Sequence, residues 1–514
     1  MNGAEALVRT AIASGIEVCF ANPGTTEMQI VAALDAAPGL RPVLALFEGV
    51  VTGAADGYAR MAAKPALTLL HLGPGFANGI ANLHNARRAG SPIVNVIGDQ
   101  ATWHLAADAP LTSDIESLAR PVSRWLRKTA TAAALAGDTA DAVAAARAGA
   151  GGIATLIVPA DCAWGEAPGP VAPRRVEPRP SVAFAAVNAA ARRLRSGKPA
   201  LILLGGDSLS RRGQLAAARV AAKSGARVCF GTFPARVERG AGLPPFAKFP
   251  YFPEQGLELL ANVGELVLAG AVEPVAFFAY PKTPSRLAPE SCHISVLATP
   301  DQDATGALEA LAEALGAKPD DGERTPRAAI APAAGPLNSE TLGRTLAALA
   351  PEGAIVVDEA ATSGAQWFGL AAGGAPHTVL SLTGGAIGQG LPNAVGAAIA
   401  CPDRRVIAFQ ADGSGMYTLQ SLWTMAREGL DVTVIVCANR AYRILKVELA
   451  RADIQQPGPA ARSLTDLTPP EIDFVSLARG LGVPGERVET AEQLAIALTR
   501  SFAGRGPRLV EALL

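Results

Sequence analysis

The sequence predicts an α/β fold of three doubly wound parallel-sheet domains, and three observations support this prediction. Short apolar runs, such as residues 66–70 and 200–204, end in glycine-containing turns, as buried strands of a parallel sheet do. Hydrophobic residues make up 49% of the chain, which suits strands covered by helices on both faces. The 514 residues correspond to about three domains of roughly 150 residues each.

Two linkers divide the chain into these domains. The first expected domain covers residues 1–165, and a proline-rich, basic linker at 166–180 follows it. The middle α/β domain is expected at 182–317. A second linker at 318–336, rich in Asp, Pro and Ala, leads to a third domain at 337–514.

The charge and the cysteine pattern argue against several classes of function. The formal net charge is −1 at pH 7, so no nucleic-acid partner is indicated. No basic run or lipid-binding amphipathic helix stands out, and no membrane partner is expected. The six cysteines lack the spacing of a metal site, which predicts reduced thiols and a cytoplasmic protein. The first residues do not resemble a signal peptide.

The first motif in chain order is a turn, Asn22-Pro23-Gly24-Thr25-Thr26-Glu27, which joins a predicted strand to a predicted helix. In one interpretation, Thr25 or Thr26 caps the helix and Glu27 occupies its first turn. The other interpretation, a contact between Thr25 and substrate, depends on the resemblance described below.

Two ionisable side chains follow at element boundaries. Glu48 lies between the apolar residues 43–47 and a small-residue helix at 50–60. Its apolar flank predicts burial, where a carboxyl group keeps its proton more readily and can relay it. A glutamate before a helix is otherwise commonly a cap or a solvated charge. His71 ends the strand at 66–70, where imidazole can position a carboxylate or carry a proton, although most isolated histidines do neither.

The stretch between Glu359 and Asp403 contains no Lys, Arg, Asp or Glu. Four glycines between positions 384 and 390, together with Pro392, interrupt it repeatedly. This pattern argues against a membrane helix and predicts buried backbone instead.

The most informative segment begins with the apolar run 406–409, which leads into Asp412-Gly413-Ser414-Gly415. Glycine lets backbone amides approach an anion closely, and a helix expected near Leu419 adds amides that favour phosphate. The next predicted strand, at 432–437, delivers Asn439 to the same sheet edge as Asp412. Because Mg²⁺ prefers oxygen ligands, the segment predicts a site for one divalent cation and a diphosphate.

This segment resembles the thiamine diphosphate (ThDP) binding motif of the pyruvate oxidase, acetolactate synthase and benzoylformate decarboxylase group. That motif reads Gly-Asp-Gly, a long spacer and Asn-Asn, and here Ala411 and Ala438 replace its first Gly and first Asn. The resemblance implies Mg²⁺ ligands from Asp412, Asn439 and the carbonyl of Ala441. It also implies cofactor contacts from Gly413, Ser414, Gly415, Asn439 and Tyr442.

The resemblance extends to the first domain, which it identifies as pyrimidine-binding, as it identifies the third as diphosphate-binding. Glu48 and the helix after it resemble the acid that activates the aminopyrimidine ring. Thr25 takes the place of a substrate-contacting serine of benzoylformate decarboxylase, and His71 falls where that enzyme has an active-site histidine. Gly73-Pro74-Gly75 and Asn78 match the acetolactate synthase pattern instead.

The same resemblance assigns the remaining cofactor contacts. Gly385 would offer its carbonyl to the pyrimidine amine, and Ile387 would lie beneath the bent cofactor unless it is ordinary core. Thr362 and Ser363 would donate to the diphosphate. The second histidine of benzoylformate decarboxylase should fall near residues 277–281, and this stretch has none.

The middle domain gives only a weak nucleotide signal, Gly205-Gly206-Asp207 after a strand. Residues 236–239 and 244–246 look more like the flavin-free branch of the family. We therefore expect no FAD.

These features predict a ThDP- and Mg²⁺-dependent enzyme that decarboxylates a small-molecule 2-oxo acid non-oxidatively through an enamine intermediate. Two alternatives stay open: a carboligase of the acetolactate synthase type, and a catalytically silent ThDP-binding homologue. Glu48, Asp412 and Asn439 are all present, which disfavours the silent form.

Substrate preference and assembly are also implied by the resemblance. Ile444, Leu445 and Glu448 match the substrate pocket of benzoylformate decarboxylase, and their bulk and charge favour a smaller or polar 2-oxo acid. Alternatively, Ile444 and Leu445 are helix core, and Glu448 lies on a solvated face with Arg451. A homodimer or homotetramer with its active site at the subunit interface is expected.

Overall fold

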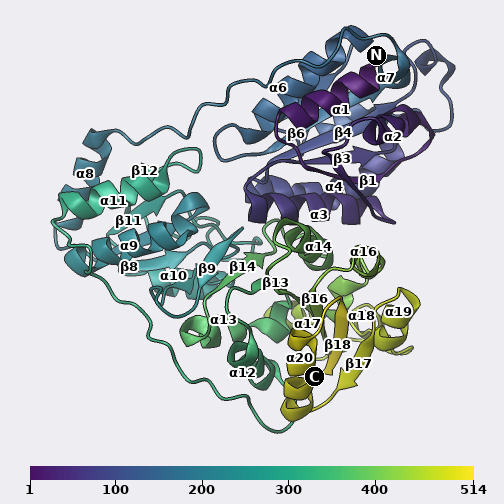
Figure 1. Ribbon diagram of the computed structural model, residues 1–514. Coiled ribbons are helices and arrows are strands. Elements are labelled where there is room, and N and C mark those ends of the chain that lie inside the picture. Colours follow the sequence, from purple (N-terminus) through teal and green to yellow (C-terminus); the bar gives the residue numbers. More distant parts are fainter. The chain divides into compact units, whose positions relative to one another are not determined.

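The structure is a computed structural model that describes residues 1–514 (Figure 1). The chain forms two compact units. Unit 1 contains both termini, and unit 2 is formed mainly by the middle of the chain. No helix is both long and apolar enough to cross a membrane. Unit 1 comprises Met1–Val176, Ala331–Phe368 and Leu382–Leu514, and unit 2 comprises Glu177–Ile330 and Gly369–Ser381.

The first sheet of unit 1 is parallel throughout, with the order β2-β1-β3-β4-β6-β5. Its strands are β1 (Val18–Asn22), β2 (Arg41–Leu44), β3 (Ala66–Leu70), β4 (Ile93–Asp99), β5 (Trp125–Lys128) and β6 (Ile153–Pro159). Its helices are α1 (Gly3–Ala13), α2 (Met28–Asp35), α3 (Glu48–Ala62), α4 (Leu72–Ala89), α5 (Ile115–Ala119), α6 (Leu135–Arg147) and α7 (Ala160–Trp164), with the short 3₁₀ helix η1 (Thr25–Glu27) before α2.

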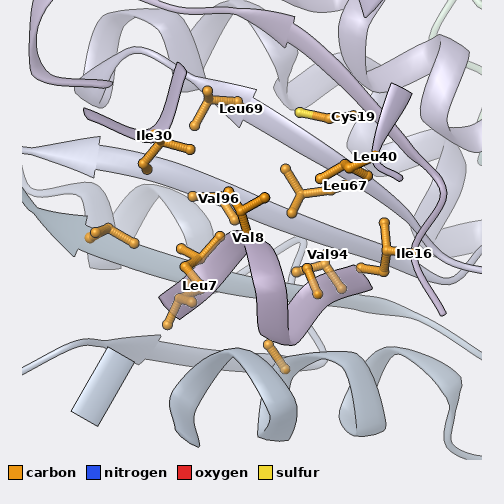
Figure 2. Close-up of a cluster of buried hydrophobic side chains, with 14 of the residues drawn as sticks. Leu7, Val8, Ile16, Cys19, Ile30, Leu40, Leu67, Leu69, Val94 and Val96 are labelled. Carbon is orange, nitrogen blue, oxygen red and sulfur yellow. The ribbon is translucent and has the colours of Figure 1, made fainter. Parts of the chain in front are cut away.

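Helix α1 packs its apolar face on this sheet. It starts at a capping box, in which the Asn2 side chain accepts from the Glu5 amide at 2.8 Å and the Glu5 carboxylate accepts from the Asn2 amide. Burial of each large aliphatic side chain contributes about 1.5–3 kcal/mol, so this cluster stabilises the sheet that carries the site. Figure 2 shows the cluster, which includes Leu7, Val8, Ile16, Cys19, Leu67, Leu69, Val94 and Val96.

The second sheet belongs to unit 2 and is also parallel, with the order β10-β8-β7-β11-β12. An antiparallel strand pair, β9 with β14, lies in the same unit. The strands are β7 (Ala200–Leu204), β8 (Arg227–Phe230), β9 (Val237–Arg239), β10 (Ala247–Lys248), β11 (Glu265–Ala269), β12 (His293–Ala298) and β14 (His377–Ser381). The helices are α8 (Phe184–Leu194), α9 (Arg211–Ser224), α10 (Pro253–Leu260) and α11 (Ala304–Ala314).

The C-terminal part of unit 1 forms five parallel strands in the order β17-β18-β16-β15-β13. These are β13 (Ile355–Glu359), β15 (Val406–Ala411), β16 (Val432–Ala438), β17 (Gly485–Val488) and β18 (Arg508–Leu513). The helices are α12 (Ser339–Leu349), α13 (Trp367–Leu370), α14 (Gly390–Ala400), α15 (Asp412–Gly415), α16 (Ser421–Arg427), α17 (Arg443–Arg451), α18 (Pro459–Ser463), α19 (Phe474–Gly480) and α20 (Ala491–Ala503).

These three parallel-rich sheets confirm the predicted fold class. The expected start of a helix near Leu419 is only partly right. The chain turns directly after β15 into the one-turn helix α15, and α16 begins at Ser421. The glycines of Asp412-Gly413-Ser414-Gly415 permit this immediate turn. The domain boundaries stay a prediction.

Candidate active site

The Asp412 carboxylate lies at the carboxyl end of β15, where it is almost fully buried. One oxygen, Oδ1, accepts from the Gly413 amide at 2.8 Å, and Oδ2 accepts from the Arg440 amide at 2.6 Å. Burial raises the pKa of Asp412 above its usual value, although backbone amides oppose this shift. A cation beside such a carboxylate would offset the cost of its buried charge.

Asn439 reaches the same edge because β15 and β16 are adjacent parallel strands. Its side-chain amide donates to Ser363 Oγ at 3.0 Å, and its Oδ1 accepts from the Ala441 amide at 3.1 Å. Between these residues, Arg440 adopts the left-handed region with φ +58°, which is uncommon outside glycine and turns the chain back over Asp412. The structure thus brings Asp412, Asn439 and Ser363 together.

This donor set suits Mg²⁺. A carboxylate, a side-chain amide oxygen and a backbone carbonyl are the hard oxygen ligands that this ion prefers. The chain has no cluster of three or more His, Cys, Asp or Glu side chains able to hold a metal. A softer site of the zinc or iron type is therefore not formed by such side chains.

The glycine turn after Asp412 leaves little room for a side chain. A Cβ at Gly413 would lie 2.5 Å from the Tyr442 ring, so the glycine allows this ring to pack over the turn. Burial raises the pKa of Tyr442 above its usual value. The hydroxyl of Ser414 is engaged by Gln410 and the Ala411 carbonyl, so Ser414 already has partners within the protein.

Thr362 and Ser363 lie in η5 (Ala361–Gly364), the short 3₁₀ helix that follows β13. Ser363 is buried and Thr362 is half-buried. The hydrogen bond from Asn439 to Ser363 ties η5 to the predicted metal ligands. Hydroxyl donors therefore lie beside those ligands, which suits a diphosphate shared with a cation.

Glu359 holds the loop that contains Gly385 and Ile387, and sequence reasoning did not single it out. Its Oε1 accepts from the amides of Gly388, at 2.7 Å, and Gln389, at 3.4 Å. Its Oε2 accepts from the Gly390 amide at 2.6 Å and from Gln410 Nε2 at 3.1 Å. The carboxylate is buried, which raises its pKa. The sequence did contain a signal for this role, because Glu359 is the carboxylate that begins a long stretch without charged residues.

Side chains of α4 contact the other side of this loop within unit 1. Asn82 donates to the Gly388 carbonyl at 3.3 Å, and Asn85 donates to the Ala386 carbonyl at 2.7 Å. From α3, Arg60 also contacts this segment. Its Nη2 donates to Thr383 Oγ1 at 3.0 Å, and its guanidinium pairs with the buried carboxylate of Asp56. Gly385 is exposed and Ile387 half-buried, so Ile387 is not ordinary core.

Glu48 is the first residue of α3, and its Oε2 accepts from Asn78 Nδ2 at 3.0 Å. A Cβ at Gly75 would lie 3.0 Å from Glu48 Oε1 and 3.3 Å from His71 Cβ, so both residues lie against this glycine on the side of its missing Cβ. The expected burial of Glu48 is wrong for the single chain. Its side chain is half-buried, and Leu46 in its apolar flank is 47% exposed.

The turn before α2 differs from the helix cap proposed as one interpretation. Thr25 starts η1 itself and is exposed, and the N-cap residue is Gly24. Thr26 donates to Glu27 Oε1 at 2.6 Å, so neither threonine is the N-cap. The fully buried Glu27 carboxylate instead accepts from the Gly24 amide and contacts His71.

The predicted pocket residues lie on α17, which has no buried residue. The interpretation of Ile444 and Leu445 as helix core is therefore wrong, since Leu445 is 46% exposed. Glu448 pairs with Arg451 at 3.5 Å, in agreement with a solvated face. Residues 277–281, which lack the second histidine of benzoylformate decarboxylase, lie in unit 2, and Phe277 and Phe278 there are exposed.

Comparisons with known proteins agree with this geometry. The family described as "Thiamine pyrophosphate enzyme, N-terminal TPP binding domain" matches residues 1–118, and its C-terminal TPP binding domain matches residues 362–512. A Mycobacterium tuberculosis protein with the provisional name acetolactate synthase large subunit IlvX is 50% identical, covering 100% of this chain and 99% of its own.

Two further proteins extend the comparison to decarboxylases. Benzoylformate decarboxylase of Pseudomonas aeruginosa is 29% identical over 97% of this chain and 96% of its own. The solved structure of a ThDP-dependent 4-hydroxybenzoylformate decarboxylase from Rhodococcus jostii RHA1 superimposes with a TM-score of 0.83 at 26% identity, covering 99% and 98% of the two chains. The chain therefore belongs to the thiamine pyrophosphate enzyme family.

Proposed function

We propose that this protein is a ThDP- and Mg²⁺-dependent enzyme that removes CO₂ from a small 2-oxo acid without oxidation. The observation that carries the proposal is that Glu48 and His71 lie close together beside Gly75, within 3.0 and 3.3 Å of the point where its Cβ would be. A carboxyl group and an imidazole at one place can move a proton and position a substrate carboxylate. The names of two relatives, a benzoylformate decarboxylase and a 4-hydroxybenzoylformate decarboxylase, support the same reaction class.

When bound, ThDP supplies the electron sink that makes loss of CO₂ possible, and the protein supplies orientation and proton traffic. Asp412, Asn439 and the Ala441 carbonyl would hold Mg²⁺, with Thr362 and Ser363 on the diphosphate. The Gly385 carbonyl and Glu48 would hold the aminopyrimidine, and Ile387 would contact the cofactor. Glu48 would exchange the pyrimidine proton.

His71 and Thr25 would act on the substrate. The imidazole would orient the substrate carboxylate and deliver a proton after CO₂ is lost, since residues 277–281 offer no second histidine. On α17, Ile444 and Leu445 add bulk and Glu448 adds charge near the predicted pocket. These side chains favour a smaller or polar 2-oxo acid over a phenyl-bearing one.

A carboligase of the acetolactate synthase type is the second candidate. Gly73-Pro74-Gly75 and Asn78 follow the acetolactate synthase pattern, which favours this candidate. Asn78 also donates a hydrogen bond to Glu48, the predicted catalytic acid. The provisional name of the 50% identical relative points the same way. The two reactions share every step up to the loss of CO₂ and differ in whether a proton or a second carbonyl compound is then accepted.

We also propose that unit 2 binds no FAD. The carboxylate of Asp207, which follows β7, accepts from the Ala304 and Thr305 amides at the start of α11, at 3.3 and 3.2 Å. A helix N-terminus favours an anion, and here an internal carboxylate already takes that place. Arg179 neutralises it at 3.3 Å.

A homodimer or homotetramer completes the proposal. Leu46, Tyr417 and Leu445 are all about half exposed, and all three lie next to predicted site residues. Where such side chains form one continuous patch, they mark a surface covered by a partner. Light scattering coupled to size exclusion measures the assembly, and a monomer at micromolar concentration would contradict it.

The decisive experiment measures CO₂ release from pyruvate, 2-oxobutyrate and benzoylformate with ThDP and Mg²⁺, and identifies the products. An aldehyde product supports the decarboxylase, whereas acetoin or acetolactate-like products support the carboligase. Glu48→Gln serves as the inactive control. Tight ThDP binding without turnover of any 2-oxo acid would contradict the 2-oxo acid assignment.

A further inference from the structure

We propose that Glu27 is a positioning residue that fixes the tautomer and orientation of His71. The inference rests on the proposed function, because it concerns how the single imidazole at Gly75 is prepared for proton transfer. Glu27 and His71 are 44 residues apart in the chain and meet at adjacent parallel strands, since η1 follows β1 and His71 follows β3.

The contacts of the Glu27 carboxylate define its role. Its Oε2 lies 2.8 Å from His71 Nδ1 and accepts from the Gly24 amide at 2.8 Å, while Oε1 accepts from Thr26 Oγ1 at 2.6 Å. The side chain is fully buried, whereas the His71 side chain is 22% exposed. A carboxylate offers only acceptors, so Nδ1 must carry the proton at this contact. In neutral His71 the lone pair then belongs to Nε2.

Two glycines provide the space that this pair occupies. A Cβ at Gly98 would lie 1.7 Å from Glu27 Oε1, and a Cβ at Gly24 would lie 2.3 Å from the His71 ring. Any side chain at either position would therefore displace the carboxylate or the imidazole. The pair is thus enclosed on both sides, and the ring is held with its Nδ1 edge against Glu27.

Orientation matters here because one imidazole serves the whole proton transfer. A histidine in the wrong tautomer presents a proton where an acceptor is needed, and this loss can be large even when the geometry is unchanged. The Glu27 carboxylate is fully buried against His71, Gly24 and Thr26, so it acts through His71 and not on substrate directly.

The first test is spectroscopic and needs no turnover. In protein labelled with ¹⁵N-histidine, the His71 signals, assigned by their loss in His71→Ala, should show a protonated Nδ1 and an unprotonated Nε2 at neutral imidazole. Glu27→Gln should keep this tautomer, because an amide oxygen at Oε2 still accepts while its NH₂ faces Thr26. Glu27→Ala should give the tautomer mixture of a free imidazole.

The second test is a double-mutant cycle on turnover of the 2-oxo acid found by the panel. Glu27→Ala should lower kcat by about 100-fold, within the range expected for general acid–base catalysis, and leave the Kd for ThDP within about 3-fold. The double variant with His71→Ala should be no slower than His71→Ala alone. Glu17→Ala, an exposed glutamate in the same sheet layer, should change neither quantity.

Additive losses in the cycle, or an Nε2-protonated His71 in the wild type, would overturn the inference. If the wild type turns over no 2-oxo acid, the proposed function fails and the tautomer measurement alone decides. An Nδ1-protonated His71 that is lost in Glu27→Ala would then still support the positioning role, and an unchanged spectrum would refute it.

Discussion

Glu359 and Glu48 are both glutamates beside the loops of the candidate site, yet their surroundings are opposite. Glu359 is buried and accepts four hydrogen bonds, from three consecutive amides and Gln410. Glu48 is half-buried and accepts from Asn78. A carboxylate whose acceptors are all used holds backbone in place, whereas one with unused oxygens can exchange protons with a ligand. The contrast agrees with the proposed roles, in which Glu359 shapes the site and Glu48 exchanges protons in it.

The largest expected effect follows from Glu48→Gln. Loss of the acidic proton should lower kcat by about 10²–10⁴-fold, the range for general acid–base groups, while the melting temperature stays within a few degrees. Steady-state kinetics and calorimetry check both parts. If this variant turned over substrate as fast as the wild type, Glu48 would have no role in proton transfer, and the proposed difference between Glu48 and Glu359 would be wrong.

The next effect concerns the metal. Asp412→Ala should abolish Mg²⁺-dependent binding of ThDP, because the central carboxylate ligand is lost. Treatment of the wild type with EDTA should do the same reversibly, with recovery on addition of Mg²⁺. Titration calorimetry with ThDP, with and without Mg²⁺, measures this. Equal ThDP affinity under both conditions would show that the cluster around Asp412 holds no cation.

Glu359→Gln should give a smaller effect, on stability. Both oxygens of Glu359 face N–H donors, so either orientation of the amide places its NH₂ against another donor, at a cost of about 1–3 kcal/mol. Chemical denaturation measures the loss, with the exposed Glu352→Gln as the matched control. A variant as stable as the wild type would mean that the loop at Gly388 is held mainly by Asn82 and Thr418.

The smallest effect is a pH dependence at Glu511, a buried residue of β18. Burial raises its pKa above the ordinary 4.5, outweighing Arg487, whose Nε lies 3.0 Å from Oε2. The folded chain therefore binds more protons than the unfolded chain above about pH 4.5, and stability decreases as pH rises. Relative to Glu511→Gln, the wild type should lose about 1 kcal/mol or less between pH 4.5 and 7. A difference that grows with pH in favour of the wild type would contradict this sign.

The fold and the closeness of Asp412 to Asn439 could be predicted from the sequence because their signals are local. The run Ala66–Leu70 has the expected bounds, since an apolar strand is limited by Pro65 on one side and by His71 on the other. Asp412 and Asn439 meet because one strand–helix–strand unit carries both. Such units return their strand ends to one edge regardless of the rest of the chain.

Residues that depend on distant partners could not be predicted. Glu27 becomes informative only when β1 and β3 pair and bring it to His71, and Glu359 only when the loop at Gly388 folds back 29 residues later. The burial expected for Glu48 was wrong for a related reason. The hydrophobicity of residues 43–47 predicts only that this segment tends to be covered. The surface that covers it lies elsewhere in the sequence or on another chain.

The absence of buried residues on α17 has a consequence for how such a protein changes over time. Substitutions at exposed positions usually alter folding stability by less than about 0.5 kcal/mol. The helix that follows the predicted metal ligands can therefore accept new side chains at Ile444, Leu445 or Glu448 with little risk to the sheet behind it. Under the proposed function, substrate preference can change through this helix while the buried side chains of the sheet stay the same.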